Sequence, residues 1–171
     1  MTDAENNPLL WLTIFSLSEQ ATRDGLTGLY NRRYFEETLA DHTATAQRYD
    51  RPLSLVLFDL DEFKQINDTN GHAAGDSALK DFSDRLKSTA RAADIIFRIG
   101  GDEFAALLPE TDPSNAWKFA ERIIREQKHP FVTAGIAALP SVDLFKEADE
   151  DLMKRKKKNR HTAPPPSNPA D

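Results

Sequence analysis

Three carboxylates of this chain stand at the ends of apolar segments, where side chains from different segments can meet. Asp102 and Glu103 follow two glycines between two apolar runs, and Asp59 closes an earlier apolar run. The glycines, Gly100 and Gly101, can take positive φ, which suits a tight turn between two strands. Two unit charges about 4 Å apart repel by on the order of 4 kcal/mol at an effective dielectric of 20. If the segments are neighbours in a sheet, the acids favour a cation between them, although Gly-Gly-Asp-Glu also suits an ordinary solvated hairpin tip.

The available ligand types point to Mg²⁺ or Mn²⁺ as the cation. The chain has no cysteine, and its four histidines are scattered, which excludes a thiolate site and disfavours zinc. Hard carboxylate oxygens suit Mg²⁺ and Mn²⁺. Such sites serve phosphoryl and nucleotidyl transfer, because the metal neutralises phosphate charge and lowers the pKa of an attacking hydroxyl. We therefore expect a nucleoside triphosphate as substrate.

Composition and charge narrow the class of protein. The 171 residues are 39% hydrophobic and 29% charged, which is typical of one globular domain. The formal net charge of −6 disfavours nucleic acid as a partner, in spite of a basic run over residues 154–160. The longest apolar run, residues 9–17, is about half the roughly 20 residues of a membrane helix, and residues 1–8 lack a secretory signal pattern. We expect no membrane span and a cytoplasmic location.

Hydrophobic periodicity predicts an α+β fold. The expected strands cover residues 53–60, 95–99, 104–108 and 131–139, and the expected helices cover residues 9–21, 31–49, 61–68, 73–90, 115–127 and 142–160. The first strand is apolar almost throughout, so it should lie centrally and be buried on both faces. Asn31 is the expected N-cap of the second helix. This order predicts a mostly antiparallel sheet flanked by helices.

The two ends of the chain differ from its central part. The helix expected over residues 9–21 is apolar around most of its surface and so needs a partner. It either packs on its own domain or pairs with the same helix of a second chain, which makes residues 1–22 a candidate dimerisation stalk. Residues 162–171 are rich in proline and are expected to be disordered.

Several motifs accompany the glycine-rich turn. They are Asp24-x-Leu-Thr-Gly-Leu-x-Asn-Arg-Arg, Asp59-x-Asp-x-Phe-Lys-x-Ile-Asn-Asp68, Gly71-His-x-x-Gly-Asp76, Arg98-x-Gly-Gly-Asp-Glu-Phe104, and Ala148-Asp149 followed by Lys156 and Arg160. In this order they resemble the GGDEF-domain diguanylate cyclases over about residues 24–160. The resemblance implies the nucleotidyl cyclase-like, ferredoxin-like fold of that family, with residues 23–161 as the GGDEF domain.

The resemblance also implies an activity. Two GTP molecules would condense to 3′,5′-cyclic di-GMP with release of two pyrophosphates, and each protomer of a homodimer would hold one GTP. Asp59 and Glu103 would bind the metals together with the Leu60 carbonyl. Asp102 would act at the reacting 3′-hydroxyl as a metal ligand or base.

How GTP is held follows from the same resemblance. Asn67 and Asp76 would read guanine, which agrees with chemistry because a carboxylate accepts from N1–H and the N2 amine, and adenine does not offer these groups. As turn caps, the same two residues would be purely structural. Backbone N–H groups near Glu62 and Phe63 would cradle the terminal phosphates. The implied phosphate-facing cations are Lys64, Lys156 and Arg160.

A second binding site is implied just before the glycine-rich turn. Arg91 and Asp94 form an Arg-x-x-Asp sequence, which in the family is an inhibitory site for the product, where arginine binds guanine and phosphate. Arg122 is a candidate second arginine. Taken alone, the tetrapeptide also fits an ordinary surface pair of charges.

Departures from the family pattern keep other functions open. The segments 124–131 and 139–148 are short, and Asn159 and Met153 stand where the family has glycine and tyrosine. The family's Thr-x-Ser-x-Gly is replaced around Val132-Thr-Ala-Gly135. A catalytically inactive module that binds cyclic di-GMP or GTP is therefore the alternative. A cyclase with a different base preference is disfavoured by Asp76.

Overall fold

The computed structural model describes residues 21–126 and 130–162, with the side chains of residues 160–162 left out. Residues 1–20 of the expected stalk (residues 1–22) and residues 163–171 of the expected proline-rich tail (residues 162–171) lie outside this description. In the described part, no helix has the length and hydropathy of a membrane span.

The described chain alternates helices and strands much as the periodicity predicts. In order they are α2 (Arg32–Arg48), β1 (Leu53–Leu60), α3 (Phe63–Asn70), α4 (His72–Thr89), β2 (Ile95–Arg98), β3 (Glu103–Pro109), α5 (Pro113–Glu126), β4 (Val132–Ala138) and α6 (Leu144–Thr162). Asn31 caps α2 through its side chain, which accepts a hydrogen bond from the N–H of Tyr34. The predicted N-cap is therefore confirmed.

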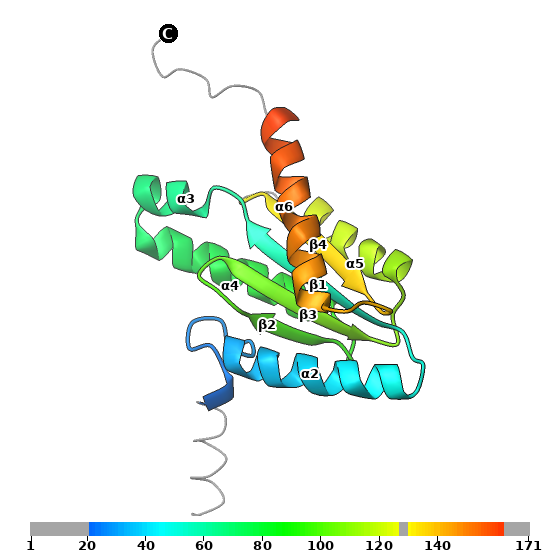
Figure 1. Ribbon diagram of the computed structural model, residues 1–171. Coiled ribbons are helices and arrows are strands. Elements are labelled where there is room, and N and C mark those ends of the chain that lie inside the picture. The colour runs from blue at the N-terminus through cyan, green and yellow to red at the C-terminus, as the bar shows by residue number, and fades with distance from the viewer. Residues whose placement is uncertain (1–20, 127–129, 163–171) are drawn as a thin grey trace, which may run out of the picture.

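The four strands form one sheet in the order β2-β3-β1-β4, and all three neighbouring pairs are antiparallel. All eight residues of β1 are buried, as expected for a central strand. Helices α2 and α6 cover one face of the sheet, and α4 and α5 cover the other (Figure 1). The predicted α+β class is thus confirmed.

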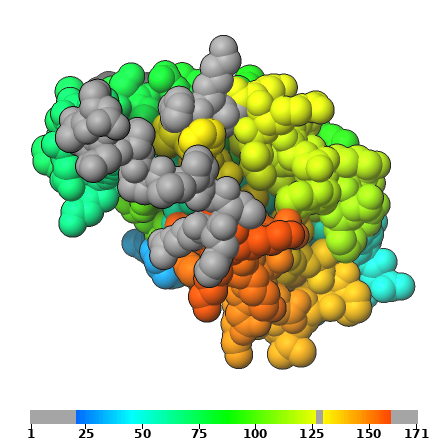
Figure 2. Space-filling view, turned by 90° about the horizontal axis from the view of Figure 1, so that it is seen from above, coloured from blue at the N-terminus to red at the C-terminus, as the bar shows by residue number. Residues whose placement is uncertain are grey.

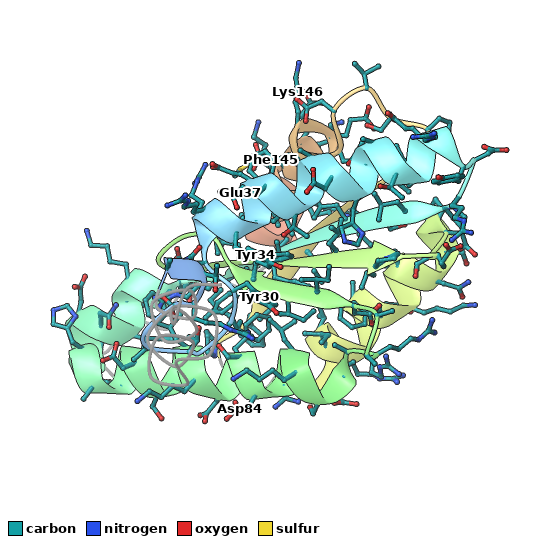
Figure 3. All side chains as sticks on the ribbon, turned by 90° about the horizontal axis from the view of Figure 1, so that it is seen from below. Tyr30, Tyr34, Glu37, Asp84, Phe145 and Lys146 are labelled. Atoms are coloured by element: carbon teal, nitrogen blue, oxygen red, sulfur yellow. The ribbon has the colours of Figure 1, made fainter. Side chains whose placement is uncertain are left out.

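Each face of the sheet has its own apolar core. On the α4 and α5 side, Phe58 and Phe104 pack edge-on against Phe82 at centroid distances of 5.8 and 4.9 Å. In the space-filling view, α5 (yellow-green) and α6 (orange) lie on different sides of the molecule, and α3 (teal-green) lies at its left edge (Figure 2). On the α2 side, aromatic rings join α2 to its neighbours. The ring centroids of Tyr30 and Tyr34 lie 4.4 Å apart (Figure 3), and those of Phe35 and Phe145 lie 5.8 Å apart.

Gly135 sets how closely α6 approaches the sheet. A Cβ at this position of β4 would lie 2.6 Å from the Cα of Leu152 and closer still to the Leu152 nitrogen and the Ala148 carbonyl. These are backbone atoms of a packed helix, so they cannot turn aside as a side-chain end could. Because Ala148 and Leu152 are buried, the same helix face points into the core and presents Lys156 one turn further on.

Replacing Gly135 with alanine should therefore force α6 away from β4. We expect Gly135→Ala to lower the free energy of unfolding by about 1–3 kcal/mol, as for other overpacked cores. Urea denaturation followed by circular dichroism measures this change. Gly25→Ala is the matched control, because a Cβ there meets nothing within 4 Å; equal stability of the two variants would contradict the packing role of Gly135.

Candidate active site

The three predicted carboxylates lie at one end of the sheet, where β1 ends and β3 begins. Asp59 is the direct partner of Glu103 in the antiparallel register, and on its other side it pairs with Thr133 of β4. Directly opposed residues point to the same face, with Cβ atoms about 4.5–5.5 Å apart. The N–H of Leu60 donates to the carbonyl of Asp102 over 3.1 Å. The turn that carries Asp102 is thereby tied to the end of β1.

The turn between β2 and β3 is closed by Glu103. Its carbonyl accepts hydrogen bonds from the N–H groups of Ile99 and Gly100 over 2.9 and 3.2 Å. Its carboxylate folds back over Gly100, where a Cβ would overlap it. Neither Gly100 nor Gly101 has φ in the left-handed region, so the expected use of positive φ is not seen. Glycine at position 100 instead makes room for the side chain of Glu103.

Lys156 brings a positive charge to these acids. It follows Leu152 by one turn of α6, and its ammonium forms an ion pair with Oδ1 of Asp59. The two side chains are only 18% and 11% exposed. Burial raises the pKa of Asp59, the Lys156 ammonium opposes this rise, and the neighbouring carboxylates of Asp102 and Asp61 add to it. A nearby cation therefore favours the ionised form of Asp59.

The acids do not form a metal cage in this conformation. Among the described side chains, no three Asp, Glu or His groups gather closely enough to hold a metal ion, since Asp59 faces Lys156 and Glu103 folds over Gly100. The expected convergence of three carboxylates is therefore not seen. The donor set still fits Mg²⁺, because it is made of oxygens from facing positions of neighbouring strands, around a place where the fold already accepts a cation. The identity of the metal ligands stays a prediction.

The connection from β1 to α3 exposes a helix start beside the acids. Glu62 has φ 59° and ψ 21°, a left-handed conformation that is uncommon for a residue with a Cβ. The first N–H groups of α3, those of Phe63 and Lys64, have no preceding carbonyl of their own helix to bond, and such groups favour anions. The Lys64 side chain is exposed. Arg160 lies in α6, but its side chain falls outside the description.

Asn67 and Asp76, the predicted guanine readers, lie where α3 meets α4. The side-chain amide of Asn67 rests against Gly75, whose Cβ would lie 3.0 Å from Asn67 Cγ and 3.1 Å from the Phe63 ring. Asp76 follows directly and is exposed. Glycine at position 75 thus lets an amide from α3 come close to the backbone of α4, one residue before Asp76.

Arg91, Asp94 and Arg122 line one groove of about 210 Å³, together with Lys118. The carboxylate of Asp94 accepts a hydrogen bond from the N–H of Arg91 over 2.7 Å, and Arg122 donates to the carbonyl of Thr89 over 3.3 Å. The structure therefore brings the three residues of the predicted product site together. With three cations and one acid, the groove suits an anionic ligand.

A partly buried ion pair that the motifs did not predict holds the turn from outside. Arg98 donates to both carboxylate oxygens of Asp24 over 3.0 and 3.2 Å and to the carbonyl of Gly101 over 2.7 Å. The backbone and hydroxyl of Thr27 donate to the same carboxylate over 2.9 and 2.7 Å. Burial alone would raise the pKa of Asp24, but the bonds from Thr27 and Arg98 outweigh burial and lower it. Asp24 and Arg98 each lie in one of the family motifs, but they are 74 positions apart. The sequence therefore does not predict that they form a pair.

A second unpredicted contact joins three segments next to Asp59. The hydroxyl of Thr133 donates to Oδ2 of Asp61 over 2.7 Å, and the side-chain amide of Asn159 donates to the Thr133 oxygen over 3.3 Å. Thr133 and Asn159 both lie where the sequence departs from the family pattern. That both positions depart from the pattern was the one signal in the sequence that could have suggested a contact between Thr133 and Asn159.

Comparison with known proteins agrees with the motifs. The family described as "Diguanylate cyclase, GGDEF domain" matches the chain over residues 21–162. The probable diguanylate cyclase DgcC of Escherichia coli K12 is 38% identical over 160 residues, an alignment that covers 85% of this chain and 43% of that protein. The diguanylate cyclase DgcS of Shewanella oneidensis is 37% identical over 157 residues, covering 85% of this chain and 53% of that protein. The chain thus spans about half the length of these relatives.

A solved structure shares the fold. The coiled coil and GGDEF domain of DgcB from Caulobacter crescentus, crystallised in complex with c-di-GMP, superimposes with a TM-score of 0.82 at 26% identity. The superposition covers 87% of each chain.

The pair between Asp24 and Arg98 predicts an acid-sensitive contribution to stability. Because the pKa of Asp24 is lower in the folded protein than its ordinary value of 3.8, its contribution is present above about pH 4 and is lost as the pH falls through the folded-state pKa. We expect Asp24→Asn to lower the free energy of unfolding by about 1–3 kcal/mol at pH 7. The difference from the wild type should shrink towards pH 3 in a series of urea denaturation curves.

Asp84→Asn is the matched control for that series, since the Asp84 side chain is 76% exposed beside Lys87 and should contribute little. A loss for Asp24→Asn that stayed constant between pH 7 and pH 3 would contradict the role given to its carboxylate.

Proposed function

The chain belongs to the GGDEF-domain family of diguanylate cyclases, and on that premise we propose that it condenses two GTP molecules into 3′,5′-cyclic di-GMP and two pyrophosphates. The observation that carries the proposal is the strand register, which pairs Asp59 with Glu103 and ties Asp102 to the end of β1. Relatives named as diguanylate cyclases support it.

In this proposal the acids divide the chemistry among them. Asp59, Glu103 and the Leu60 carbonyl would hold Mg²⁺ or Mn²⁺, which when bound would neutralise phosphate charge and lower the pKa of the attacking hydroxyl. Asp102 lies at the 3′-hydroxyl and takes its proton or helps to hold the metal. The 3′-oxygen then bonds to the α-phosphorus of the other GTP, and the bond from that phosphorus to pyrophosphate breaks. The same attack by the 3′-oxygen of the second nucleotide on the first closes the ring and releases the second pyrophosphate.

The helices supply the groups that hold the nucleotide. Asn67 and Asp76 bind the guanine edge, and the first N–H groups of α3 bind phosphate oxygens. The cations proposed for the phosphates are Lys64, Lys156 and Arg160. Because one domain holds one GTP and the reaction joins two, the active form is a homodimer with its two sites facing each other.

The groove with Arg91 and Arg122 is proposed to bind the product and inhibit the enzyme. Guanidinium groups match both phosphate and the guanine edge through paired hydrogen bonds. The gathering of Arg91, Asp94 and Arg122 around one cavity supports this assignment.

A second candidate function is a receptor for cyclic di-GMP without turnover. One observation favours it: the arginine groove is assembled, whereas no three acids of the described residues gather around a metal position. A receptor would bind cyclic di-GMP tightly and leave GTP unchanged.

Removing either turn carboxylate tests the proposed reaction. We expect Asp102→Asn and Glu103→Gln to lower the rate of cyclic di-GMP formation from GTP and Mg²⁺ by about 10²–10⁴-fold, with little loss of stability because each change relieves repulsion among acids. Product is measured by chromatography at protein concentrations high enough for a dimer. Glu110→Gln, an exposed acid at the other end of β3, should keep full activity. Wild-type rates in either turn variant would refute the assigned roles, and an inactive wild type would favour the receptor.

The product site is tested by binding rather than by turnover. Arg91→Ala should weaken cyclic di-GMP binding by roughly 10–100-fold, the equivalent of one or two charge-assisted hydrogen bonds. Isothermal titration calorimetry measures the affinity, and Arg51→Ala, an exposed arginine paired with Glu110, serves as control. Unchanged affinity in Arg91→Ala would exclude this groove as the product site.

A further inference from the structure

The ion pair between Lys156 and Asp59 is less exposed to solvent than most ion pairs among the described residues. Its side chains are 18% and 11% exposed, whereas those of the pair between Arg32 and Glu36 are 61% and 62% exposed. Water and salt therefore screen the pair between Lys156 and Asp59 much less. Because the contact is shielded, the position of the Lys156 ammonium strongly affects the electrostatics around Asp59.

The fold fixes the backbone that carries Lys156. On one side, the absence of a Cβ at Gly135 lets the backbone of α6 at Leu152 pack directly against β4. On the other side, Asn159 donates to Thr133 of β4. Lys156 stands between these two anchors, so its ammonium reaches Asp59 because the helix puts it there. The side chain itself is long and can turn about its own bonds.

A second clamp holds the same helix from outside. Arg155 lies 4.2 Å from the centre of the Trp117 ring of α5 and bonds Asp151 over 2.8 Å. Asp151 in turn accepts the N–H of Ile136 over 3.0 Å. Helix α6 is thus joined to α5 and β4, and we expect the Lys156 side chain, rather than the helix, to move when Asp59 changes partner.

The acid that Lys156 contacts is also the first predicted metal ligand. A divalent cation bound to Asp59 would need the carboxylate that the ammonium now contacts, and two cations this close repel each other. The nearby acids Asp61 and Asp102 make a cation at Asp59 favourable in either case. Lysine and metal are therefore alternative occupants of one position.

We propose that Lys156 is a displaceable counter-ion that competes with the divalent metal for Asp59 and leaves Asp59 for the phosphates when the nucleotide binds. This inference deepens the proposed function and rests on it. In the nucleotide-free protein Lys156 weakens metal binding. Once its ammonium has moved to phosphate oxygens, Asp59 is released, so metal and nucleotide strengthen each other's binding reciprocally.

The test is a titration with Mn²⁺ alone, followed by the electron paramagnetic resonance of the free ion, on the full chain without nucleotide. We expect Lys156→Gln to bind Mn²⁺ on the order of tenfold more tightly than the wild type, because the competing charge is gone. Lys156→Arg, which keeps the charge, should remain close to the wild type. Lys154→Gln removes the same charge from an exposed position of the same helix and should also remain close to it.

Two further measurements make the result decisive. Adding Asp59→Asn to Lys156→Gln should remove the gain, which places the tighter binding at Asp59. Repeating the titration with α,β-methylene GTP should show strong mutual enhancement of Mn²⁺ and nucleotide in the wild type and less in Lys156→Gln. Lys156→Met provides the same loss of charge if the glutamine variant does not fold.

Equal or weaker Mn²⁺ binding by the uncharged variants, or no detectable binding by any of the proteins, would overturn the inference. Turnover plays no part in these titrations. An active enzyme with unchanged Mn²⁺ affinity in Lys156→Gln would refute the counter-ion role alone, whereas tighter binding in a protein that never forms cyclic di-GMP would count against the proposed reaction alone.

Discussion

A shielded carboxylate at the end of the central strand lies against a cation, and this contact organises the site. Asp59 lies at the end of a strand whose residues are all buried, and burial raises its pKa. The Lys156 ammonium, which a packed helix brings over the sheet, opposes this rise. A shielded carboxylate whose ionised form is favoured by a neighbouring cation is a suitable ligand for a metal that arrives with a polyphosphate.

Two structural devices hold the surroundings of that carboxylate in place. On one side, Gly135 allows α6 to approach the sheet closely, so the helix cannot be shifted without disturbing the apolar core between the sheet and helices α2 and α6. On the other side, Arg98 joins Asp24 to the carbonyl of Gly101. The glycine-rich turn is therefore fixed from the start of the described chain, and the lysine is fixed from its end. Residues distant in sequence thus control a few atoms around Asp59.

Much of the fold follows from local patterns in the sequence. The apolar run of residues 53–60 predicted a central strand, and Asn31 predicted a helix start, because burial and capping depend on neighbours in the sequence. Whether Asp59 and Glu103 face each other depends on which strands are neighbours. The sequence predicted that these acids meet only if their two strands are adjacent in the sheet. The partner of Arg98 depends on tertiary packing and could not be read from spacing. The side-chain direction of Glu103 and the cation at Asp59 depend on rotamers and local charge, which no motif encodes.

In the mechanism that we propose, acids of β1 and β3 act together on a nucleotide, and Lys156 exchanges Asp59 for phosphate. Anomalous diffraction at the manganese edge, from crystals grown with Mn²⁺ and α,β-methylene GTP, tests it most directly. We expect manganese bound by Asp59 and Glu103 and the Lys156 ammonium on a phosphate oxygen. Manganese bound elsewhere, or Lys156 still paired with Asp59 in the presence of the nucleotide, would contradict it.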